Sequence, residues 1–465
     1  MSTVFDPLHL QAAMLDVLAA AHATPALVAQ RQQHRLLRLL EAAREGSVLY
    51  RERMGSPRSH WSDLARIAPV SRAELMARFS DWVTDPELEL DQLRAFIADP
   101  SRIGESWRDR YLVWESSGAS GMPGVFVQDA QALAVYDALE AARHRPPARG
   151  AGSLFSAFGA IDTLGLNDRT ALVAAGGGHF ASLVAFERLR RINPWLTPLA
   201  RSFNLLSPVH ELVAALNDFQ PTILATYPTA AALLADEATA GRLHIAPRHV
   251  LTGGEHLGAA VRARVTQALG APVRNSYGAS EFLPIAWECA HGHLHVNEDW
   301  VLLEPVDSQY RPVPPGHVSH SVLLTNLANL VQPLIRYDLG DKIKVLPGRC
   351  PCGSSMPRIE VQGRRDDVLR VPGRKPGETV SLLPLALSTV VEGEGVFDFQ
   401  LQQRGPGTLA LRVPLQGEAA RQAIDRCRRA LQQFAEAQGA QPISVVGETG
   451  CAVPRGRSGK ACRVA

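Results

Sequence analysis

The chain of 465 residues lacks any long hydrophobic run, since no apolar stretch approaches the ~20 residues that a transmembrane helix needs. Its first ten residues, MSTVFDPLHL, also lack the basic region followed by an apolar stretch that is typical of a secretory signal. We therefore expect no membrane partner and a cytoplasmic location.

The chain is also poor in cysteine and in net charge. Six cysteines are too few for a disulfide scaffold in a chain of this length, so in a reducing cytosol they are free thiols or metal ligands. A formal net charge of only +2 argues against a protein that coats nucleic acid. Apolar content is ordinary and no tract is repetitive, which predicts a globular protein of roughly two to four domains or subdomains.

Apolar spacing predicts helices over most of residues 1–105, and a different pattern follows. Short apolar runs end in loops rich in glycine or other small residues, and helical stretches come next. This alternation predicts an α/β fold with a parallel sheet flanked by helices, whose ligands bind at the loops after the strands. We place five runs in this pattern and expect their loops to face one crevice: YLVW, TALVAA, TILATY, HVLT and PVRNSY.

After Gly363 the composition changes. The segment RRDDVLRVPGRKPGE is charged and rich in turn formers, as expected of a linker or hinge. Two strand-like runs, FDFQLQQ and LALRVPL, and the helical stretch EAARQAIDRCRRALQQFAEAQ then predict a small α+β domain. We therefore expect an N-terminal domain over 1–363 and a C-terminal domain over 364–465. The second is the more basic, with 15 Lys and Arg against 10 Asp and Glu.

The stretch WESSGASGMPG, from Trp114 to Gly124, has the composition of a phosphate-binding loop but not its full pattern. A P-loop has a lysine after its second glycine, where this chain has Met122. The nucleophile elbow G-x-S-x-G fails at the same residue. A Gly/Ser loop alone is more often a plain turn than a ligand site, so its interpretation depends on the other motifs.

Four further motifs contain residues suited to nucleotide chemistry. NSYGASEF contains a ring that could stack on a purine and a carboxylate that could hold Mg²⁺, and RYDLGD ends in an acid that could accept ribose hydroxyl protons. GRRDD opens the small domain with an arginine, and PRGRSGK carries a lysine near the chain end. Taken singly, each motif also fits a hairpin turn, a solvated acid, a charged linker or a basic tail.

In their order and spacing, these motifs resemble those of the adenylate-forming superfamily of acyl-CoA synthetases, aryl-CoA ligases and carrier-loading domains. The resemblance runs from about Trp114 to the C-terminus. It implies a large N-terminal domain, a small mobile C-terminal domain and two half-reactions. ATP and a carboxylate first form an acyl-adenylate and pyrophosphate, and a thiol then displaces AMP.

The resemblance also implies roles for single residues. The catalytic residues would be Lys460, Arg364 and Glu281, which would also bind Mg²⁺, and the hinge would be Asp366. The nucleotide would be bound by Ser116, Ser117, Gly118, Ala119, Ser120, Gly121, Gly254, Glu255, Asn275, Ser276, Tyr277, Gly278, Ser280 and Asp341.

Three residues of the loop depart from the family pattern. Ala119 stands where the family usually has threonine, Met122 where this branch often has lysine, and Gly124 where others have a basic or polar residue. The departures predict a weaker grip on phosphate that depends more on backbone N–H groups. They leave a non-catalytic nucleotide-binding homologue as an alternative.

A second constellation consists of Cys289 and His295 in ECAHGHLHVNED and of Cys350 and Cys352 in RCPCGSS. Three thiolates and one imidazole make a closed tetrahedral Zn²⁺ site, whereas the plainer alternative is buried cysteines beside unrelated histidines. A similar arrangement in the phenylacetate–CoA ligase branch implies a structural zinc.

The histidine ligand and the purpose of the zinc site leave alternatives. His291 and His293 compete as ligands, and the resemblance to the phenylacetate–CoA ligase branch points to His295. A zinc ribbon that binds nucleic acid is disfavoured by Glu298, Asp299 and the nearly balanced charge.

The acid substrate and the acceptor are less constrained. A glycine-floored slot with aromatic walls would suit an aryl acid such as a benzoate, hydroxybenzoate or phenylacetate, although an aliphatic acid and an ordinary core remain alternatives. Its candidate residues are His179, Phe180, Tyr227, Gly253 and Ala279. Coenzyme A is the acceptor that the branch implies. A basic helix face could instead dock an acidic acyl carrier protein as the acceptor. As a separate matter, the chain could form a homodimer.

Overall fold

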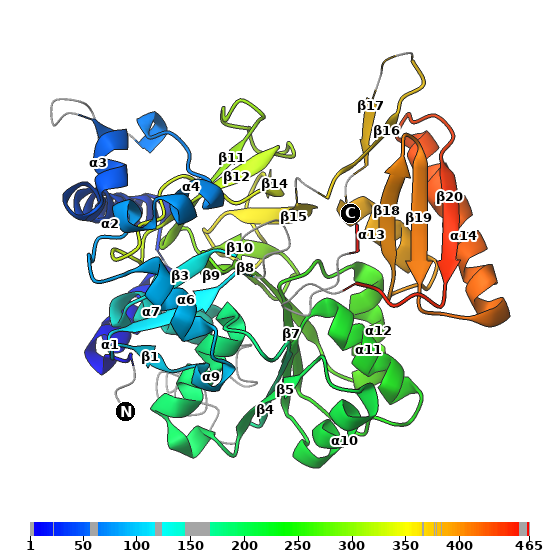
Figure 1. Ribbon diagram of the computed structural model, residues 1–465, viewed down its shortest axis with the longest axis horizontal. Helices are drawn as coiled ribbons and strands as arrows, with labels where there is room; N and C mark the ends of the chain where they lie inside the picture. The colour runs from blue at the N-terminus through cyan, green and yellow to red at the C-terminus, as the bar shows by residue number, and fades with distance from the viewer. Residues whose placement is uncertain are drawn as a thin grey trace.

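The computed structural model describes residues 4–21, 23–55, 64–116, 123–144, 168–364, 367–375, 377, 379–382, 384–454 and 463–464. These residues form a larger body, which runs from the N-terminus to β15, and a smaller body that contains β16 to β20 with α13 and α14 (Figure 1). The α/β architecture with a large N-terminal and a small C-terminal part confirms the predicted fold class.

Helices dominate the chain up to β1 (Ser106–Trp107). Hydroxyl side chains cap three of them: Thr24, Ser47 and Ser71 each accept a hydrogen bond from a backbone N–H in the first turn. The helical segments are α1 (Pro7–Ala21), α2 (Pro25–Gly46), α3 (Val48–Met54), η1 (Leu64–Arg66), α4 (Arg72–Ala77), α5 (Phe79–Trp82), α6 (Leu90–Ile97) and η2 (Pro100–Arg102).

A nine-stranded mixed sheet forms the centre of the larger body in the part of the chain described. Its order is β14-β15-β10-β9-β8-β7-β6-β4-β5. The parallel half consists of β4 (Thr170–Ala174), β5 (Ala200–Asn204), β6 (Ile223–Thr226), β7 (His249–Gly253) and β8 (Val273–Ala279). The connecting helices are α9 (Ala181–Ile192), α10 (Val209–Phe219), α11 (Pro228–Thr239) and α12 (Ala259–Leu269).

The other half of this sheet is antiparallel, which the strand–helix alternation did not predict. It consists of β9 (Phe282–Glu288), β10 (Leu294–Val296), β14 (Asp341–Leu346) and β15 (Arg358–Arg364). β8 is therefore followed by an antiparallel strand instead of a helix, and our assignment of PVRNSY to the strand–loop–helix series was wrong. Gly278 permits the tight return, because a Cβ there would collide with the carbonyl oxygen of Leu283 on β9.

The assignment of YLVW to that series was also wrong. The Gly/Ser loop follows β2 (Tyr111–Glu115) but leads into an antiparallel partner, β3 (Val125–Gln128), in a separate sheet of order β1-β2-β3. The backbone N–H of Ser116 donates to the carbonyl of Gly124 (2.8 Å), and the Gly124 N–H donates to Ser116 Oγ (2.8 Å). These two bonds continue the antiparallel pairing of β2 and β3 to Ser116 and Gly124.

Further strands complete the two bodies. In the larger body, α7 (Ala130–Leu139) and η3 (Glu140–His144) follow β3, η5 (Pro194–Leu196) follows α9, and a small sheet contains β11 (Val301–Val306), β12 (Ser321–Asn326) and β13 (Tyr337–Asp338). The smaller body contains β16 (Leu369–Pro372), β17 (Thr379–Leu382), α13 (Pro384–Gly393), β18 (Gln400–Gly405), β19 (Thr408–Val413), α14 (Gly417–Ala437) and β20 (Ser444–Thr449).

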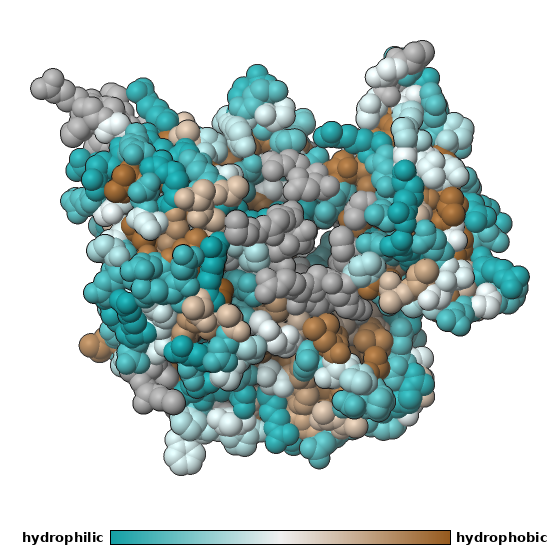
Figure 2. Space-filling model, viewed as in Figure 1, coloured by the Kyte–Doolittle hydropathy of each residue, from teal (hydrophilic) through white to brown (hydrophobic). Residues whose placement is uncertain are grey.

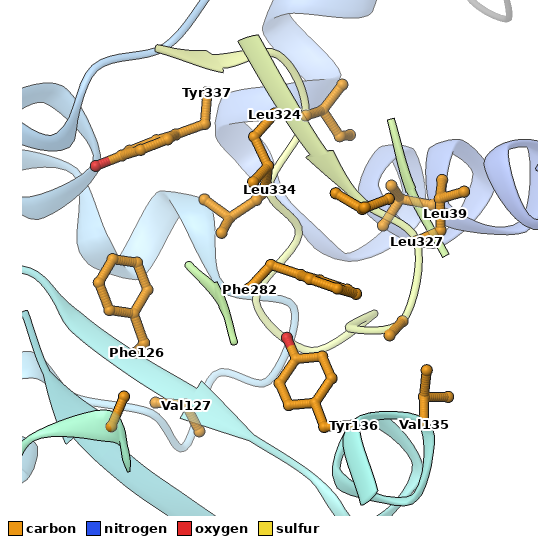
Figure 3. Close-up of a cluster of buried hydrophobic side chains, with 14 of the residues drawn as sticks. Leu39, Phe126, Val127, Val135, Tyr136, Phe282, Leu324, Leu327, Leu334 and Tyr337 are labelled. Carbon is orange, nitrogen blue, oxygen red and sulfur yellow. The ribbon is translucent and has the colours of Figure 1, made fainter. Parts of the chain in front are cut away.

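Hydrophobic cores hold each body together. One core of the larger body joins the N-terminal helices to the sheets β1-β2-β3 and β11-β12-β13. It includes the edge-to-face pair of Tyr136 and Phe282, whose ring centroids are 4.9 Å apart. Figure 3 shows Phe282 between Tyr136 and Leu334 in this core. A separate core is made only from residues of the smaller body, between Leu369 and Val464.

The two bodies also touch. Gly258 is the N-cap residue of α12, and a Cβ there would collide with Oε2 of Glu392 on α13. Glu392 in turn pairs with Arg463, and Val464 extends the edge of β18 by a bridge to Leu401.

The surface facing the viewer in Figure 2 is largely hydrophilic, with apolar residues in separate patches. None of the helices in the described ranges has the length and apolarity needed to cross a bilayer.

Candidate functional site

A cavity of about 1110 Å³ lies between the two bodies. Its walls come from α4, the loop after β7, the β8–β9 turn, residues 337–341 and β15. Residues of the smaller body such as Ser388 and Arg463 also line it. The motifs NSYGASEF, RYDLGD and GRRDD, which are far apart in the sequence, therefore meet in one space.

Glu281 is a buried acid on the wall of this cavity. Its carboxylate oxygen Oε1 accepts a hydrogen bond from the Tyr337 hydroxyl (2.7 Å). Burial raises the pKa of the Glu281 carboxyl above its usual range, while the Tyr337 hydrogen bond and the charges of Arg364 and Arg72 oppose this rise. A buried carboxylate with nearby cations is suited to bind a metal ion or to interact with a charged substrate.

Asp341 forms the second acidic group of the cavity. Its Oδ2 accepts a hydrogen bond from the Tyr277 hydroxyl (2.6 Å), and its Oδ1 lies 3.2 Å from Arg364 Nη1. Burial, followed by the charge of Asp341, raises the pKa of the Tyr277 hydroxyl well above its ordinary value. Tyr277 therefore stays a neutral donor that orients the carboxylate, and Arg364 ties the end of β15 to the same acid.

The remaining predicted nucleotide residues in the described ranges occupy mixed positions. Ser116, Gly254, Glu255, Asn275, Ser276, Gly278 and Ser280 line the cavity. Glu255 also caps α11, because its Oε2 accepts a hydrogen bond from the backbone N–H of Thr229 (3.0 Å). Ser117, Gly118, Ala119, Ser120 and Gly121, together with Met122, Asp366 and Lys460, lie outside the described residues.

Of the predicted substrate-pocket residues, only Ala279 lines the cavity in the part described. His179 is fully buried, and its Nε2 lies 2.9 Å from the Asp99 carbonyl oxygen. Phe180 and Tyr227 are also buried, and burial raises the pKa of Tyr227 to about 12. Gly253 packs against β8, where a Cβ would lie 2.7 Å from Ser276 Oγ.

The structure brings together the four predicted metal ligands, Cys289, His295, Cys350 and Cys352, with all ligand atoms within 4.8 Å of one another. The sulfur atoms of Cys289 and Cys350 are 3.8 Å apart. Zn–S bonds of about 2.3 Å in a tetrahedral site separate two sulfurs by about the same distance. The donor set and its spacing therefore fit zinc.

His295 is oriented for this role by a second hydrogen bond. Its Nδ1 lies 2.9 Å from the carbonyl oxygen of Met356, and its Nε2 lies 3.3 Å from the sulfur of Cys352. Such an outer hydrogen bond commonly orients the histidine ligand of a metal. His293 comes within 3.5 Å of Cys350 but is not one of the four grouped residues, and His291 is exposed.

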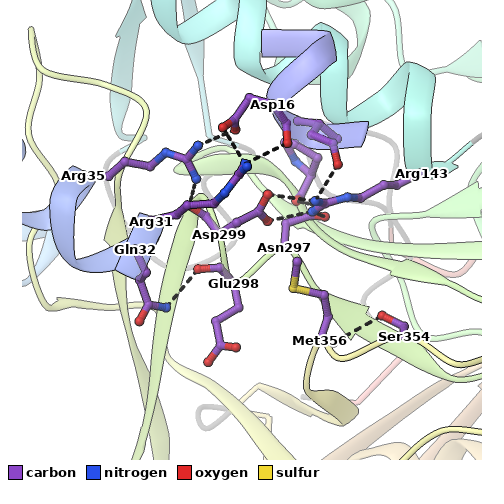
Figure 4. A network of polar contacts seen from close by, with 12 residues as sticks. Asp16, Arg31, Gln32, Arg35, Arg143, Asn297, Glu298, Asp299, Ser354 and Met356 are labelled. Carbon is purple, nitrogen blue, oxygen red and sulfur yellow. Dashed lines mark hydrogen bonds and ion pairs between the residues drawn. The ribbon is translucent and has the colours of Figure 1, made fainter. Parts of the chain in front are cut away.

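Asp299, which follows His295 in the sequence, has a structural role. Asp299 is fully buried and receives two hydrogen bonds of 2.7 Å from Arg143, whose Nη1 also donates to Asn297 (2.7 Å). Figure 4 shows how Arg35 links this group to Asp16 of α1. The network joins the N-terminal helices to the segment that carries the metal ligands.

Several cavity residues were missed by sequence reasoning. Tyr337 lies within RYDLGD, and its position four residues before Asp341 was a usable signal. Arg72, His256 and Arg463 had no comparable signal, because one is in the helical lead-in and the other two adjoin motifs assigned for other residues.

Comparisons of the sequence with known proteins find a family profile and several relatives. A family profile described as "AMP-binding enzyme" matches residues 198–319, which include Tyr277 and Glu281. Protein CapK of Staphylococcus aureus is 26% identical over 163 residues, which are 34% of each chain. A phenylacetate-coenzyme A ligase of Pseudomonas putida is 30% identical over 171 residues, 35% of this chain and 38% of the relative. The match thus spans little more than a third of these relatives' length.

Among solved structures, that of 2-hydroxyisobutyryl-CoA ligase in complex with an acyl-adenylate superposes with a TM-score of 0.68. The superposition covers 96% of this chain and 91% of that one, at 20% identity. At this identity the likeness establishes the shared fold of both bodies.

Proposed function

Because the chain is a member of the adenylate-forming superfamily, we propose that it activates a small carboxylic acid with ATP and transfers the acyl group to the thiol of coenzyme A. In the first step the substrate carboxylate attacks the α-phosphorus, and the bond to the departing pyrophosphate breaks. In the second step the thiol sulfur attacks the acyl carbon, AMP leaves, and the thiol proton is released.

The observation that carries this proposal is the joint placement of Glu281 with Tyr337 and of Asp341 with Tyr277 and Arg364 in one cavity between the two bodies. The carboxylate of Asp341, held by a neutral tyrosine and an arginine, is suited to accept hydrogen bonds from the ribose hydroxyls. The flanking cavity is large enough for a nucleotide with an attached acyl group, since small-molecule sites commonly measure about 300–1,000 Å³.

We assign the charge stabilisation of the first step to three parts of the chain. Backbone N–H groups of the loop that begins at Ser116 would hold the departing pyrophosphate, and Arg364 would orient the ribose acid. Lys460, near the chain end, would bridge the substrate carboxylate and the α-phosphate. Residues 1–363 and 364–465 would act as two domains, with the smaller turning about Asp366.

Glu281 also fits a Mg²⁺ ligand. It is a buried carboxylate oxygen donor, which Mg²⁺ prefers, and burial without a bound cation raises the pKa of this carboxyl. A bound Mg²⁺ would supply positive charge to the phosphate oxygens, and Tyr337 would keep the carboxylate oriented. The zinc site at Cys289, His295, Cys350 and Cys352 would be structural, because four protein ligands close its coordination shell.

The acid is proposed to be aromatic, as in the phenylacetate–CoA ligase branch, and this assignment rests mainly on sequence likeness to the Pseudomonas putida enzyme. Of the predicted pocket residues only Ala279 contributes to the cavity walls. Transfer to a separate acyl carrier protein is the second candidate. It rests on four arginines of α14, Arg421, Arg426, Arg428 and Arg429, of which the first three also pair with acids.

The test is acid-dependent exchange between ATP and pyrophosphate without any thiol, across benzoates, cinnamates, phenylacetates and short fatty acids. We expect exchange with aryl acids and, after CoA is added, formation of the aryl-CoA thioester. Thioester formation on a carrier protein but not on CoA would favour the second candidate. Absence of exchange with every acid, in folded and zinc-loaded protein, would contradict the proposal.

A further inference from the structure

The cavity wall contains a cation that the phosphate-loop motif lacks. Arg72 is the first residue of α4, and its side chain lines the cavity. Burial raises the pKa of both Glu281 and Tyr337, and the positive charge of Arg72 opposes that rise in both. The guanidinium therefore lies near that pair. Arg72 belongs to the N-terminal helical region and not to any of the nucleotide motifs.

Backbone contacts on both sides hold α4 in this position. Just before the helix, the Val70 N–H donates to the carbonyl of Arg336 (3.1 Å), and the Val70 carbonyl accepts from the Asp338 N–H (2.9 Å). Within the helix, Met76 Sδ accepts a hydrogen bond from the Val125 N–H (3.4 Å). Arg72 is therefore fixed relative to β13, which carries Tyr337, and relative to β3, which follows the Gly/Ser loop.

The end of that loop leaves room for Arg72. A Cβ at Gly124 would lie 2.9 Å from the ring of Phe126 and 3.3 Å from Cδ of Arg72. In the family that the sequence resembles, others have a basic or polar residue where this chain has Gly124, and this branch often has lysine where this chain has Met122. The side chain of Arg72 therefore reaches the end of the loop, next to Gly124, from another element.

We propose that Arg72 binds the β- and γ-phosphate oxygens of ATP and the departing pyrophosphate, in place of the lysine missing at Met122. The proposal rests on the adenylating function proposed above. A guanidinium can donate two parallel hydrogen bonds to phosphate oxygens, and it stays charged at any working pH. Negative charge collects on pyrophosphate as it leaves, so a fixed cation there lowers the barrier.

The experiment compares wild type with Arg72→Ala and Arg72→Lys in ATP–pyrophosphate exchange. We expect Arg72→Ala to lower kcat/KM for ATP by about 100-fold, the usual effect of losing one such donor, with little change in KM for the acid. Arg72→Lys should retain part of the activity. The matched control is Arg78→Ala, since Arg78 directly follows the same helix, pairs with Glu52 and Asp81, and is not among the residues that line the cavity.

A rescue variant separates phosphate binding from a merely structural role. Adding Met122→Lys to Arg72→Ala should restore exchange by at least about 10-fold, because the cation returns from the loop itself. Unchanged kcat/KM for ATP in folded Arg72→Ala protein would overturn the proposal, and so would failure of the rescue.

A binding measurement distinguishes this inference from the proposed function. If wild type shows no exchange, calorimetric titration with inorganic pyrophosphate still tests the role of Arg72. Binding by wild type that is lost in Arg72→Ala would support the inference alone. Equal binding by both proteins, or none by either, would overturn it.

Discussion

The proposed chemistry depends most directly on the carboxyl group of Glu281, which is oriented by the hydroxyl of Tyr337. The carboxyl is buried, its pKa is raised by that burial, and the Tyr337 hydroxyl donates to it. Neutral glutamine has nearly the same shape and can accept the same hydrogen bond. Charge and shape can therefore be tested separately at this position.

We expect Glu281→Gln to lower ATP–pyrophosphate exchange by about 100-fold or more, because the negative charge that would bind Mg²⁺ is lost. The free energy of unfolding should stay within about 1 kcal/mol of wild type, or rise, since no charge is buried any longer. Exchange assays and urea unfolding of the same preparation check both. Tyr337→Phe is the comparison variant, and it should destabilise the protein by leaving the carboxylate without this donor. Wild-type exchange in Glu281→Gln would remove Glu281 from the mechanism.

Among the elements, the β9–β10 hairpin and the segment before β15 are joined by the proposed zinc ligands. Cys289 and His295 come from the first, and Cys350 and Cys352 from the second. The second segment also contacts the N-terminal helices, because Ser355 Oγ donates to the Ala23 carbonyl (3.0 Å). Loss of the metal should therefore loosen three parts of the chain together.

We expect one zinc per chain by elemental analysis and none in Cys352→Ser. Metal loss is among the changes that exceed the usual ~1 kcal/mol effect of a substitution, so the unfolding temperature should fall clearly in this variant and after chelation. Exchange activity per folded molecule should change little, because no ligand of the set lines the cavity. Cys451→Ser, outside the cluster, is the control. A metal-free wild type of unchanged stability would contradict the zinc assignment.

In the whole molecule, the contact between the two bodies contains a histidine with an unusual ionisation. His256 lines the cavity, and burial, followed by the charge of Arg463 on the smaller body, lowers its pKa to about 4. The ordinary value is about 6.5, so between these values the unfolded chain binds a proton that the folded chain does not. Folding is therefore disfavoured as pH falls from about 6.5 towards 4.

We expect this group to reduce the free energy of unfolding by about 2 kcal/mol between pH 7 and pH 5. His256→Gln should remove that part of the pH dependence while leaving stability at pH 7 similar. Urea unfolding at both pH values, with His291→Gln as the exposed control, checks the expectation. Equal pH dependence in wild type and His256→Gln would show that this histidine titrates normally in the folded protein.

The sequence alone determined the features that depend on local pattern. Alternating strands and helices predicted the parallel half of the sheet, and turn-rich composition after Gly363 preceded a small α+β body. C-x-C-G spacing indicated a metal site, the resemblance to the phenylacetate–CoA ligase branch pointed to His295 among three histidines, and the four predicted ligands do meet in space. These patterns predict structure correctly because each arises within one element or at one turn.

Only the tertiary structure decided which distant elements face one another. The Gly/Ser loop joins two antiparallel strands of a separate sheet, and β8 returns as β9, because hydrogen bonding between strands depends on partners that local patterns do not specify. His179, Phe180 and Tyr227 have the composition of a pocket, but in the fold they are buried in packing contacts. Arg72 reaches the cavity that Glu281 also lines because backbone hydrogen bonds join segments more than 200 residues apart, and no pattern within either segment specifies that pairing.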